Sequence, residues 1–315
     1  MAEIGQSISK AKELLVRNEL VAVATETVYG LAANALSEQA VLKIFEAKKR
    51  PHFDPLIIHL FSIDKIDPYV KSVPDIYKRL YEHFCPGPLT FVFEKNSIIP
   101  DLVTSGRNTV AVRFPSHPLF RELLQVLDFP LAAPSANPFT YVSPVTALHV
   151  QEQLGSKIPY ILDGGSSEIG IESTIVHYID GVLRIYRLGG LSVEEIRKVL
   201  VDTEVEILNH SESPSAPGQL KSHYSPGIKL YLDTLPESLE SEIALLRFKE
   251  YHGSFPIYQQ FILSKDASLE TAAKNLFAIL RKLSKMNIKA IYAERVPNYG
   301  LGMAINDRLE RAAAS

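Results

Sequence analysis

Short apolar segments alternate with amphipathic segments along most of the chain. The short segments are rich in Val, Ile, Phe and Tyr and lie close to Gly or Pro, a pattern typical of buried strands. We therefore expect strands at residues 20–25, 56–60, 90–94, 109–114, 160–163 and 174–179. Apolar positions that recur with the helical period predict helices at residues 7–18, 37–49, 74–83, 118–127, 144–154 and 192–200.

The segment 37–49 has the clearest helical pattern. Ser37 is a suitable N-cap, and apolar side chains follow it at helical spacing. Lys48 and Arg50 belong to a run of cations at the end of this helix, where positive charge complements the helix dipole. Pro51 prevents the helix from continuing.

Both periodicities stop near residue 206. The stretch 208–221 is rich in Ser, Pro and Gly, which predicts a linker. Beyond it we expect strands at 228–232, 243–248, 256–263 and 288–293 and helices at 268–285 and 304–313. The chain is therefore expected to form a first domain over residues 1–205, a linker or lid over 206–227, and a small α/β domain with a largely parallel sheet over 228–315.

The composition is that of an ordinary globular protein. The 315 residues are 46% hydrophobic and 22% charged, with a formal net charge of −3. These values argue against a disordered chain and against a uniformly basic surface for nucleic acid. The single cysteine, Cys85, excludes an internal disulfide framework and a Cys-rich metal site, and we expect a cytoplasmic protein. We expect no signal peptide and no membrane-spanning helix, and no Walker or dinucleotide-binding glycine motif occurs.

Polar side chains lie next to several of the predicted strands and helices. Thr27 follows the first predicted strand, Arg113 shares a strand face with Thr109, and Ser135 lies among small residues. The Arg113 guanidinium must meet solvent, an anion or a carboxylate, and an ion pair with a purely structural role is the simplest of these. Ser143 comes directly before a predicted helix and suits its N-cap. None of these positions alone distinguishes a binding site from a structural role.

Three further groups leave the same choice open. The cations 48–50, followed by a loop stiffened by two prolines, suit a triphosphate clamp as well as a helix end. His59 lies inside an apolar strand, where a histidine is more often a core residue than a ligand. Paired glycines near Ser173 and Arg187 suit an anion cradle or a hairpin.

Taken together and in this order, these segments resemble the YrdC-type threonylcarbamoyl-AMP synthases. The resemblance covers roughly residues 8–200 and rests on TETVYGL at 25–31, KKRPHFDPLIIH at 48–59, CPGPLT at 85–90, VAVRFP at 110–115, AAPSAN at 132–137 and ESTIV at 172–176. The segments APGQLKSHYSP at 216–226 and GLGMAINDRL at 300–309 are similar to the longer, two-domain members of this family.

The resemblance implies a fold and an activity. The fold is a YrdC-like twisted open-sheet α/β domain with a concave, positively lined cavity, followed by a small Rossmann-like α/β domain. The family consists of nucleotidyltransferases that convert L-threonine, bicarbonate or CO2 and ATP into L-threonylcarbamoyl-adenylate and diphosphate. A separate transferase then moves the threonylcarbamoyl group to tRNA. The resemblance further implies Mg²⁺ on the ATP phosphates and no other cofactor. We expect a monomer without a membrane partner, and the sequence assigns no metal ligand.

The resemblance also implies roles for individual residues. Lys48 and Arg50 match the family's cations that face the nucleotide phosphates, and we interpret these two as catalytic. Asp54 stands where the family has asparagine, and a carboxylate repels phosphate unless it is protonated or bridged by Mg²⁺. The residues implied to bind L-threonine are Thr27, His59, Arg113 and Ser173. Those implied to bind ATP are Arg50, Asp54, Thr109, Ser135, Ser143, Arg187 and Tyr224.

Two other functions compete with this one. An RNA-binding module would use the same cationic cavity, but the near-neutral charge and the lack of alternating aromatic and basic residues argue against it. The second is a related carbamoyl-adenylate enzyme that acts on carbamoyl phosphate, as in hydrogenase maturation factors. The linker and the C-terminal segment fit the threonine enzyme better.

Overall fold

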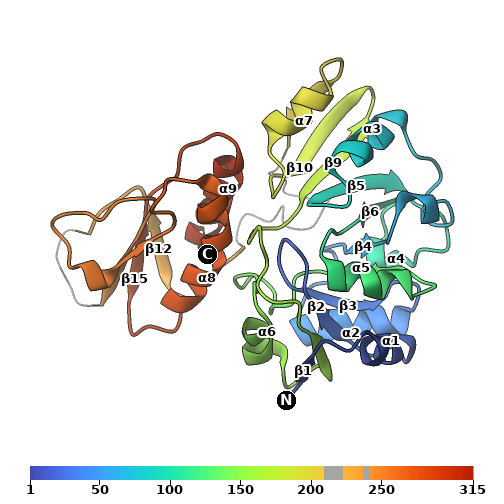
Figure 1. Ribbon diagram of the computed structural model, residues 1–315, viewed down its shortest axis with the longest axis horizontal. Helices are drawn as coiled ribbons and strands as arrows, with labels where there is room; N and C mark the ends of the chain where they lie inside the picture. The colour runs from blue at the N-terminus through green and yellow to red at the C-terminus, as the bar shows by residue number, and fades with distance from the viewer. Residues whose placement is uncertain (209–222, 237–241, 315) are drawn as a thin grey trace.

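The computed structural model describes residues 1–208, 223–236 and 242–314, and within these ranges it contains two β-sheets (Figure 1). The larger sheet has eleven strands in the order β1-β8-β2-β3-β7-β4-β6-β5-β9-β10-β11. Parallel and antiparallel pairs are mixed in it. Its strands are β1 Glu3–Gly5, β2 Val21–Val23, β3 Gly30–Asn34, β4 Ile57–His59, β5 Leu89–Glu94, β6 Thr109–Arg113, β7 Leu131–Ala132, β8 Tyr160–Leu162, β9 Thr174–Ile179, β10 Val182–Arg187 and β11 Glu204–Ile207.

Central strands of this sheet bring polar residues from distant parts of the chain to the same end of the sheet. Strands β4 and β6 are parallel and pair His59 with Arg113, so both side chains lie at the carboxyl ends of their strands. Strand β5 runs antiparallel to β6 and pairs Thr90 with Arg113. Strand β9 runs parallel to β5 and pairs Thr174 with Leu89. The register therefore assembles polar groups at one edge of the sheet, which is where α/β sheets usually bind ligands.

Helices connect and cover the strands of the larger sheet. They are α1 Ile8–Val16, α2 Glu38–Lys48, η1 Ile63–Lys65, α3 Asp75–Phe84, α4 Asp101–Thr104, α5 Pro118–Gln125, α6 Ala147–Leu154 and α7 Val193–Val199. Helix α2 begins as predicted, because the Ser37 side chain accepts a hydrogen bond from the Ala40 backbone N–H. It ends at Lys49, whose backbone is left-handed with φ 53°. This turn directs Arg50 back toward the sheet.

The smaller sheet is entirely parallel, with the strand order β12-β15-β13-β14. Its strands are β12 Lys229–Leu232, β13 Ile243–Arg247, β14 Gln260–Ile262 and β15 Ala290–Ala293. The short helix η2 Ile257–Gln259 and the helices α8 Leu269–Leu283 and α9 Leu301–Ala313 complete this unit. In Figure 1, α8 and α9 lie on the side of the small sheet that faces the larger unit. These two helices therefore form the boundary with the larger unit.

The structure confirms the α/β class, and most predicted elements have their counterparts. Two expectations were wrong in detail, and some strands were missed. The strand expected at 256–263 begins as the helix η2, and only its second half is extended. The helix expected at 144–154 starts later, because Thr146 and not Ser143 caps it. Strands such as β3 and β10 were not predicted. Residues 209–221 of the predicted linker stretch 208–221 lie outside the described residues.

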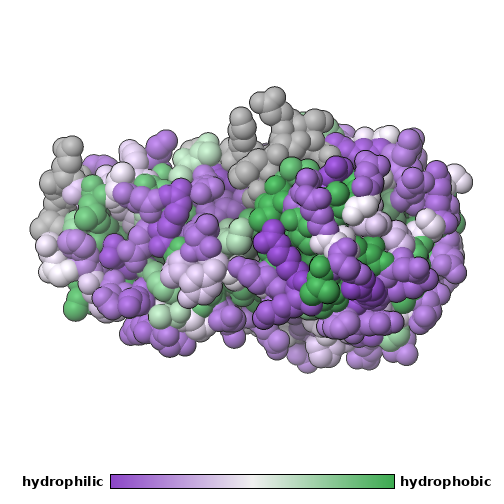
Figure 2. All heavy atoms as spheres, turned by 90° about the horizontal axis from the view of Figure 1, so that it is seen from above, coloured by the Kyte–Doolittle hydropathy of each residue, from purple (hydrophilic) through white to green (hydrophobic). Residues whose placement is uncertain are grey.

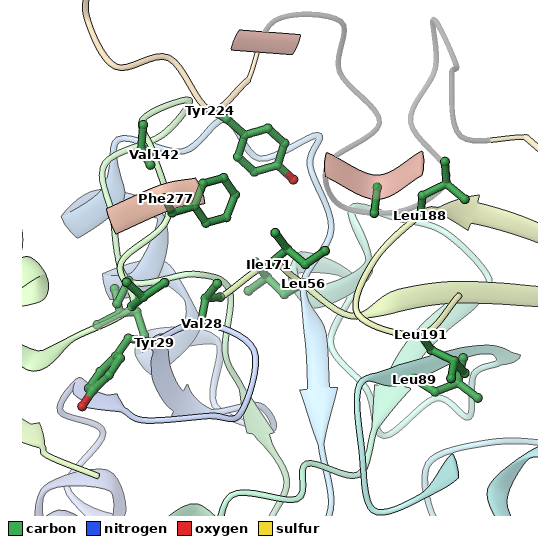
Figure 3. Close-up of a cluster of buried hydrophobic side chains, with 14 of the residues drawn as sticks. Val28, Tyr29, Leu56, Leu89, Val142, Ile171, Leu188, Leu191, Tyr224 and Phe277 are labelled. Atoms are coloured by element: carbon green, nitrogen blue, oxygen red, sulfur yellow. The ribbon is translucent and has the colours of Figure 1, made fainter. Parts of the chain in front are cut away.

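One apolar cluster runs through both units. It includes Val142 and Ile171 from the larger unit, Phe277 from α8, and Tyr224 from the segment between β11 and β12. Figure 3 shows Tyr224 and Phe277 close together, and their rings stack at a centroid distance of 5.4 Å. The small unit is therefore packed onto the larger one through buried side chains. Figure 2 shows that the outer surface in this view is mostly hydrophilic, with apolar residues in smaller groups. No helix in the described ranges is long and apolar enough to span a membrane.

Candidate active site

The structure contains a small cavity at the carboxyl ends of β4 and β6. Its volume is about 50 Å³, which is room for roughly four water molecules at ~10–15 Å³ each. Side chains of the larger unit enclose it, together with His223 and Tyr224. The residues that line it are Thr27, Val28, Arg50, Ile57, His59, Arg113, Ala133, Pro134, Ser135, Glu172, Ser173, Arg187, His223 and Tyr224. Three arginines thus line a single space, together with His223 and Tyr224.

Arg113 is held at the end of β6 by a buried ion pair. Its Nη2 donates to Glu26 Oε1 at 2.7 Å, and its Nε donates to the Gly87 carbonyl at 3.3 Å. Burial opposes ionisation of Glu26, but the Arg113 guanidinium outweighs it and lowers the pKa of that carboxyl below its usual value. No described residue accepts a hydrogen bond from Arg113 Nη1. One amino group of the fork is therefore left for an anion in the cavity.

His59 and Thr27 lie on the same side of the cavity as Arg113. Burial lowers the pKa of His59 to about 3, and the Arg113 charge acts in the same direction. The imidazole is therefore neutral at physiological pH. The Thr27 hydroxyl lies 2.8 Å from that of Thr25, which in turn donates to the Val28 carbonyl at 2.6 Å. Two neutral polar side chains, Thr27 and His59, therefore line the cavity together with the Arg113 cation.

Arg50 enters the cavity from the end of α2 and is fixed by the loop that follows it. Its Nε and Nη2 donate to the carbonyls of Asp54 and Pro55 at 3.1 and 2.9 Å. Nη2 also forms an ion pair with Asp54 Oδ2 at 2.8 Å. Burial raises the pKa of the Asp54 carboxyl, although Arg50 and Lys48 oppose this shift. Asp54 itself is buried behind Arg50 and does not line the cavity.

Lys48 lies behind the cavity wall. Its ammonium group donates to the carbonyls of Ser135 and Asn137, so it holds the loop that carries Ser135. Burial and the neighbouring Arg50 charge lower the pKa of Lys48 well below its usual value. A buried ammonium near a second cation is strained electrostatically, and an anion in the cavity would relieve that strain. The position suits a group that acts on phosphate through its charge.

Arg187 and Ser173 form the opposite wall. Arg187 Nε donates to the Ser173 carbonyl at 3.0 Å, and its Nη2 donates to the Ser173 hydroxyl at 3.0 Å. That hydroxyl lies 2.8 Å from the hydroxyl of Thr90 on β5. Gly189 allows this approach, because a Cβ there would lie 2.4 Å from the Glu172 carbonyl. The wall is therefore set by close backbone packing between the 172–173 segment and the turn after β10.

The structure brings eight predicted site residues to the cavity and leaves four elsewhere. Those at the cavity are Thr27, Arg50, His59, Arg113, Ser135, Ser173, Arg187 and Tyr224. Lys48 and Asp54 lie behind its wall, and the Ser143 hydroxyl donates to Glu172 Oε1 at 2.5 Å. Thr109 lies at the opposite end of β6 from Arg113 and pairs with Glu94.

Sequence reasoning missed Glu26, Glu172, His223 and Arg308 as parts of this region. Glu26 pairs with Arg113, Glu172 and His223 line the cavity, and Arg308 of α9 binds Glu172. Glu26 and Glu172 stand inside quoted motifs, and each is an acidic residue next to a threonine or serine that was assigned a role. Among the described residues, no group of three or more His, Cys, Asp or Glu side chains is arranged to hold a metal ion.

Two family models define the class of this protein. A family model described as "Telomere recombination", for Sua5, YciO and YrdC proteins, matches residues 13–189. A second, described as "Threonylcarbamoyl-AMP synthase, C-terminal domain", matches residues 191–314. The chain is therefore a two-domain protein of the Sua5 type, with a YrdC domain followed by a Sua5 C-terminal domain.

Curated and solved relatives agree over nearly the full length. The threonylcarbamoyl-AMP synthase of Pyrococcus abyssi is 39% identical, with 94% of this chain and 90% of the relative covered. That of Bacillus subtilis is 37% identical, with 97% and 92% covered. The crystal structure of P. abyssi Sua5 complexed with L-threonine has a TM-score of 0.90 at 34% identity and covers 99% of this chain and 97% of that one. The chain belongs to the threonylcarbamoyl-AMP synthase family, whose members are nucleotidyltransferases.

More distant structures share the fold alone. Full-length HypF in a phosphate- and nucleotide-bound form is 21% identical, with a TM-score of 0.52 over 58% of this chain. YciO of E. coli is 18% identical, with a TM-score of 0.54 over 60% of this chain. Neither match covers both units of this chain.

Proposed function

We propose that this chain joins L-threonine, bicarbonate or CO2, and ATP into L-threonylcarbamoyl-adenylate, with release of diphosphate. Family membership over nearly the whole chain supports the reaction. The observation that carries it is the single cavity into which Arg50, Arg113 and Arg187 all project. Such a space suits substrates that together carry a carboxylate and a triphosphate.

The threonine subsite is proposed to lie beside Arg113. The Nη1 group of Arg113 would bind the substrate carboxylate, while Glu26 holds the guanidinium in place. Thr27, neutral His59 and Ser173 surround this position and offer polar atoms for the threonine hydroxyl and amine. A hydroxyl that is hydrogen-bonded in this way would discriminate strongly against valine, whereas serine lacks only a methyl group.

The nucleotide subsite is proposed to lie between Arg50 and Arg187. Both guanidiniums would neutralise triphosphate charge, and Lys48 would add to this field from behind the wall. Ser135 and Tyr224 would contact the nucleotide from either side. For Asp54, Thr109 and Ser143, a contact with ATP would require these side chains to move from the positions described above.

The chemistry proposed here needs positioning and charge neutralisation and no covalent enzyme intermediate. The threonine amine adds to CO2 and loses a proton to water, and the resulting carbamate oxygen attacks the α-phosphorus of ATP. The bond from that phosphorus to the bridging oxygen breaks, and diphosphate leaves. ATP is proposed to bind as its magnesium complex, so the ion would enter as part of the substrate and would neutralise part of the phosphate charge. Arg50 and Arg187 would stabilise the charge that develops on the phosphate groups.

The segment at His223 and Tyr224 is proposed to act as a lid. The cavity between the lining side chains is too small for a nucleotide, so this segment must move outward before ATP binds. When it returns, Tyr224 excludes water from a mixed anhydride that hydrolyses readily. We accordingly propose the division into a catalytic domain 1–205, a linker or lid 206–227 and a C-terminal domain 228–315.

Diphosphate release tests this proposal. Mg-ATP and bicarbonate should release diphosphate only when L-threonine is present, with serine weaker and valine inactive. The product is proposed to pass to a separate transferase that acts on tRNA in the cytoplasm, and the enzyme is proposed to act as a monomer. Absence of release with every amino acid, together with binding of tRNA alone, would support the RNA-binding alternative instead.

A further inference from the structure

A second, larger pocket lies next to the active-site cavity, and the mechanism above does not use it. Its volume is about 490 Å³, which is within the ~300–1,000 Å³ of typical small-molecule pockets. Glu26 follows β2, His117 follows β6 and Gly164 follows β8, and all three residues line this pocket. It therefore lies at the carboxyl ends of strands of the larger sheet, where α/β folds usually bind ligands. We call it the rear pocket.

The ion pair between Glu26 and Arg113 separates the rear pocket from the active-site cavity. Arg113 lines the active-site cavity, Glu26 lines the rear pocket, and Arg113 Nη2 donates to Glu26 Oε1 at 2.7 Å. The other oxygen, Glu26 Oε2, is buried and has no hydrogen-bond partner among the described residues. The side chain is only 6% exposed, so bulk water does not satisfy this oxygen. One oxygen of a buried carboxylate is therefore left for a ligand in the rear pocket.

His117 supplies a second buried acceptor without a partner. Its Nε2 lies 3.2 Å from the Gly164 carbonyl oxygen, so in the neutral imidazole this nitrogen carries the proton and donates. Nδ1 is then an acceptor, and no described residue donates to it. A buried acceptor that lacks a donor is costly. A ligand that brings N–H groups into the rear pocket would satisfy both His117 and Glu26.

The charges around the rear pocket favour a cation. Glu122 and Glu168 lie at its exposed rim, and no Lys or Arg of the described ranges lines it. Helix α5 begins here, but its N-terminus carries only about half a unit of positive charge, and Pro118 at its first position has no N–H to offer an anion. With Glu26, three carboxylates outweigh that partial charge. A bare metal ion fits poorly, because no set of three ligating side chains is arranged for one in the part of the chain that the structure describes.

We propose that the rear pocket binds a protonated alkyl diamine. One ammonium group would donate to Glu26 Oε2 and His117 Nδ1, the two buried acceptors that the protein leaves without donors. The second ammonium group would lie near the rim carboxylates of Glu122 and Glu168. An ammonium group combines the charge and the donors that this set of side chains lacks.

The bound amine should also raise the affinity for threonine. Glu26 offsets part of the Arg113 charge, which is proposed to attract the threonine carboxylate. An ammonium group on Glu26 Oε2 would neutralise Glu26 in turn, so that more of the Arg113 charge would act on the substrate. Threonine would then raise the affinity for the amine by the same factor. This coupling rests on the proposed function, whereas the amine site itself does not.

Calorimetry on the full-length protein without substrates tests the site. 1,4-Diaminobutane should bind one-to-one with a dissociation constant of about 1 mM or lower. 1-Aminobutane, which has one ammonium group, should bind about three-fold more weakly, and tetramethylammonium, which has no N–H donor, about ten-fold or more. All titrations are made at the same ionic strength, because salt screens charges. Equal binding of the three cations would show unspecific attraction and would overturn the proposal.

Three variants locate the site. Glu26→Gln should weaken diaminobutane binding about ten-fold or more. Ser166→Arg places a cation at the exposed rim of the rear pocket and should abolish binding while Glu26 keeps its pair with Arg113. This variant carries the test if Glu26→Gln does not fold. Ser97→Arg adds the same charge to the exposed turn after β5 and should bind diaminobutane as the wild type does. Wild-type affinity in Ser166→Arg would overturn the assignment of the amine to this pocket.

The coupling is tested separately by titrating threonine with and without diaminobutane. Saturating amine should lower the threonine dissociation constant of the wild type about five-fold and should have no effect in Ser166→Arg. An unchanged threonine affinity in wild-type protein that holds the amine would overturn the coupling. Absence of threonine-dependent diphosphate release would refute the proposed function, and the amine titrations would still decide whether the rear pocket is a binding site.

Discussion

Replacing Arg113 with methionine should damage threonine binding and stability through two separate effects. The guanidinium and its partner Glu26 are both 6% exposed, so solvent screens their interaction very little. Methionine keeps much of the aliphatic volume but leaves Glu26 as an uncompensated buried charge. Breaking a buried pair in this way costs about 3–5 kcal/mol of folding free energy.

The loss of threonine affinity follows from the hydrogen bonds to the substrate that would be lost. A hydrogen bond to a charged group contributes about 1.5–3 kcal/mol, and Arg113 Nη1 is proposed to donate to the threonine carboxylate. Loss of about 2 kcal/mol raises the threonine dissociation constant roughly 30-fold. The affinity for an ATP analogue should stay within about two-fold, because Arg50 and Arg187 are unchanged.

Two measurements separate these effects. Denaturant unfolding near pH 7 gives the change in stability, and calorimetry with threonine and the ATP analogue gives the two affinities. Adding Glu26→Gln to Arg113→Met should recover part of the stability, because the unpaired charge disappears, but should recover none of the threonine affinity. If the variant lost ATP affinity and kept threonine affinity, the assignment of Arg113 to the carboxylate would be refuted.

Three other predictions concern residues around the same cavity. Asp54→Asn removes a carboxylate behind Arg50 and should lower the KM for ATP about three-fold at pH 8. Because burial raises the pKa of Asp54, this difference from wild type should shrink as the pH falls and the wild-type carboxyl becomes protonated. A KM equal to that of wild type at both ends of the pH series would contradict this prediction. The imidazole resonances of His59 should stay constant from about pH 8 to 5 in NMR spectra, because burial lowers its pKa to about 3. A titration midpoint at the ordinary histidine pKa would contradict its buried, neutral state. Tyr224→Ala should lower kcat/KM for ATP about ten-fold, while Tyr224→Phe, which keeps the ring stacked on Phe277, should lose much less.

Local pattern in the sequence was enough to predict most strands and helices. Strands such as 109–113 and 174–179 are short, rich in β-branched residues and close to Gly or Pro. Helix α2 has an N-cap, an apolar stripe and a terminating proline in the expected order. The missed strand β3 has the sequence GLAAN, whose small residues carry little strand preference. It pairs with β2, which is nearby in the chain, and with β7, which lies about 100 residues further on, and local pattern gives no sign of the second partner.

The candidate site was predictable as a set of residue types and less so as a geometry. The resemblance selected Arg50, Arg113 and Arg187, and the fold places all three at one cavity. Their partners were not predictable from local pattern, since Glu26 lies 87 residues from Arg113. Arg308 lies 136 residues from Glu172, on a different unit of the chain. Such pairs form only when the sheet register and the packing of α9 bring them together.

The fate of the carbon atom of bicarbonate tests the central claim most directly. The full-length protein would be incubated with ¹³C-bicarbonate, Mg-ATP and L-threonine, and the products would be separated and analysed by mass spectrometry. The proposed reaction predicts an adenylate that contains both the threonine and the labelled carbon, formed in equal amount to diphosphate. An adenylate without the label, or one that forms from carbamoyl phosphate and does not require threonine, would contradict it.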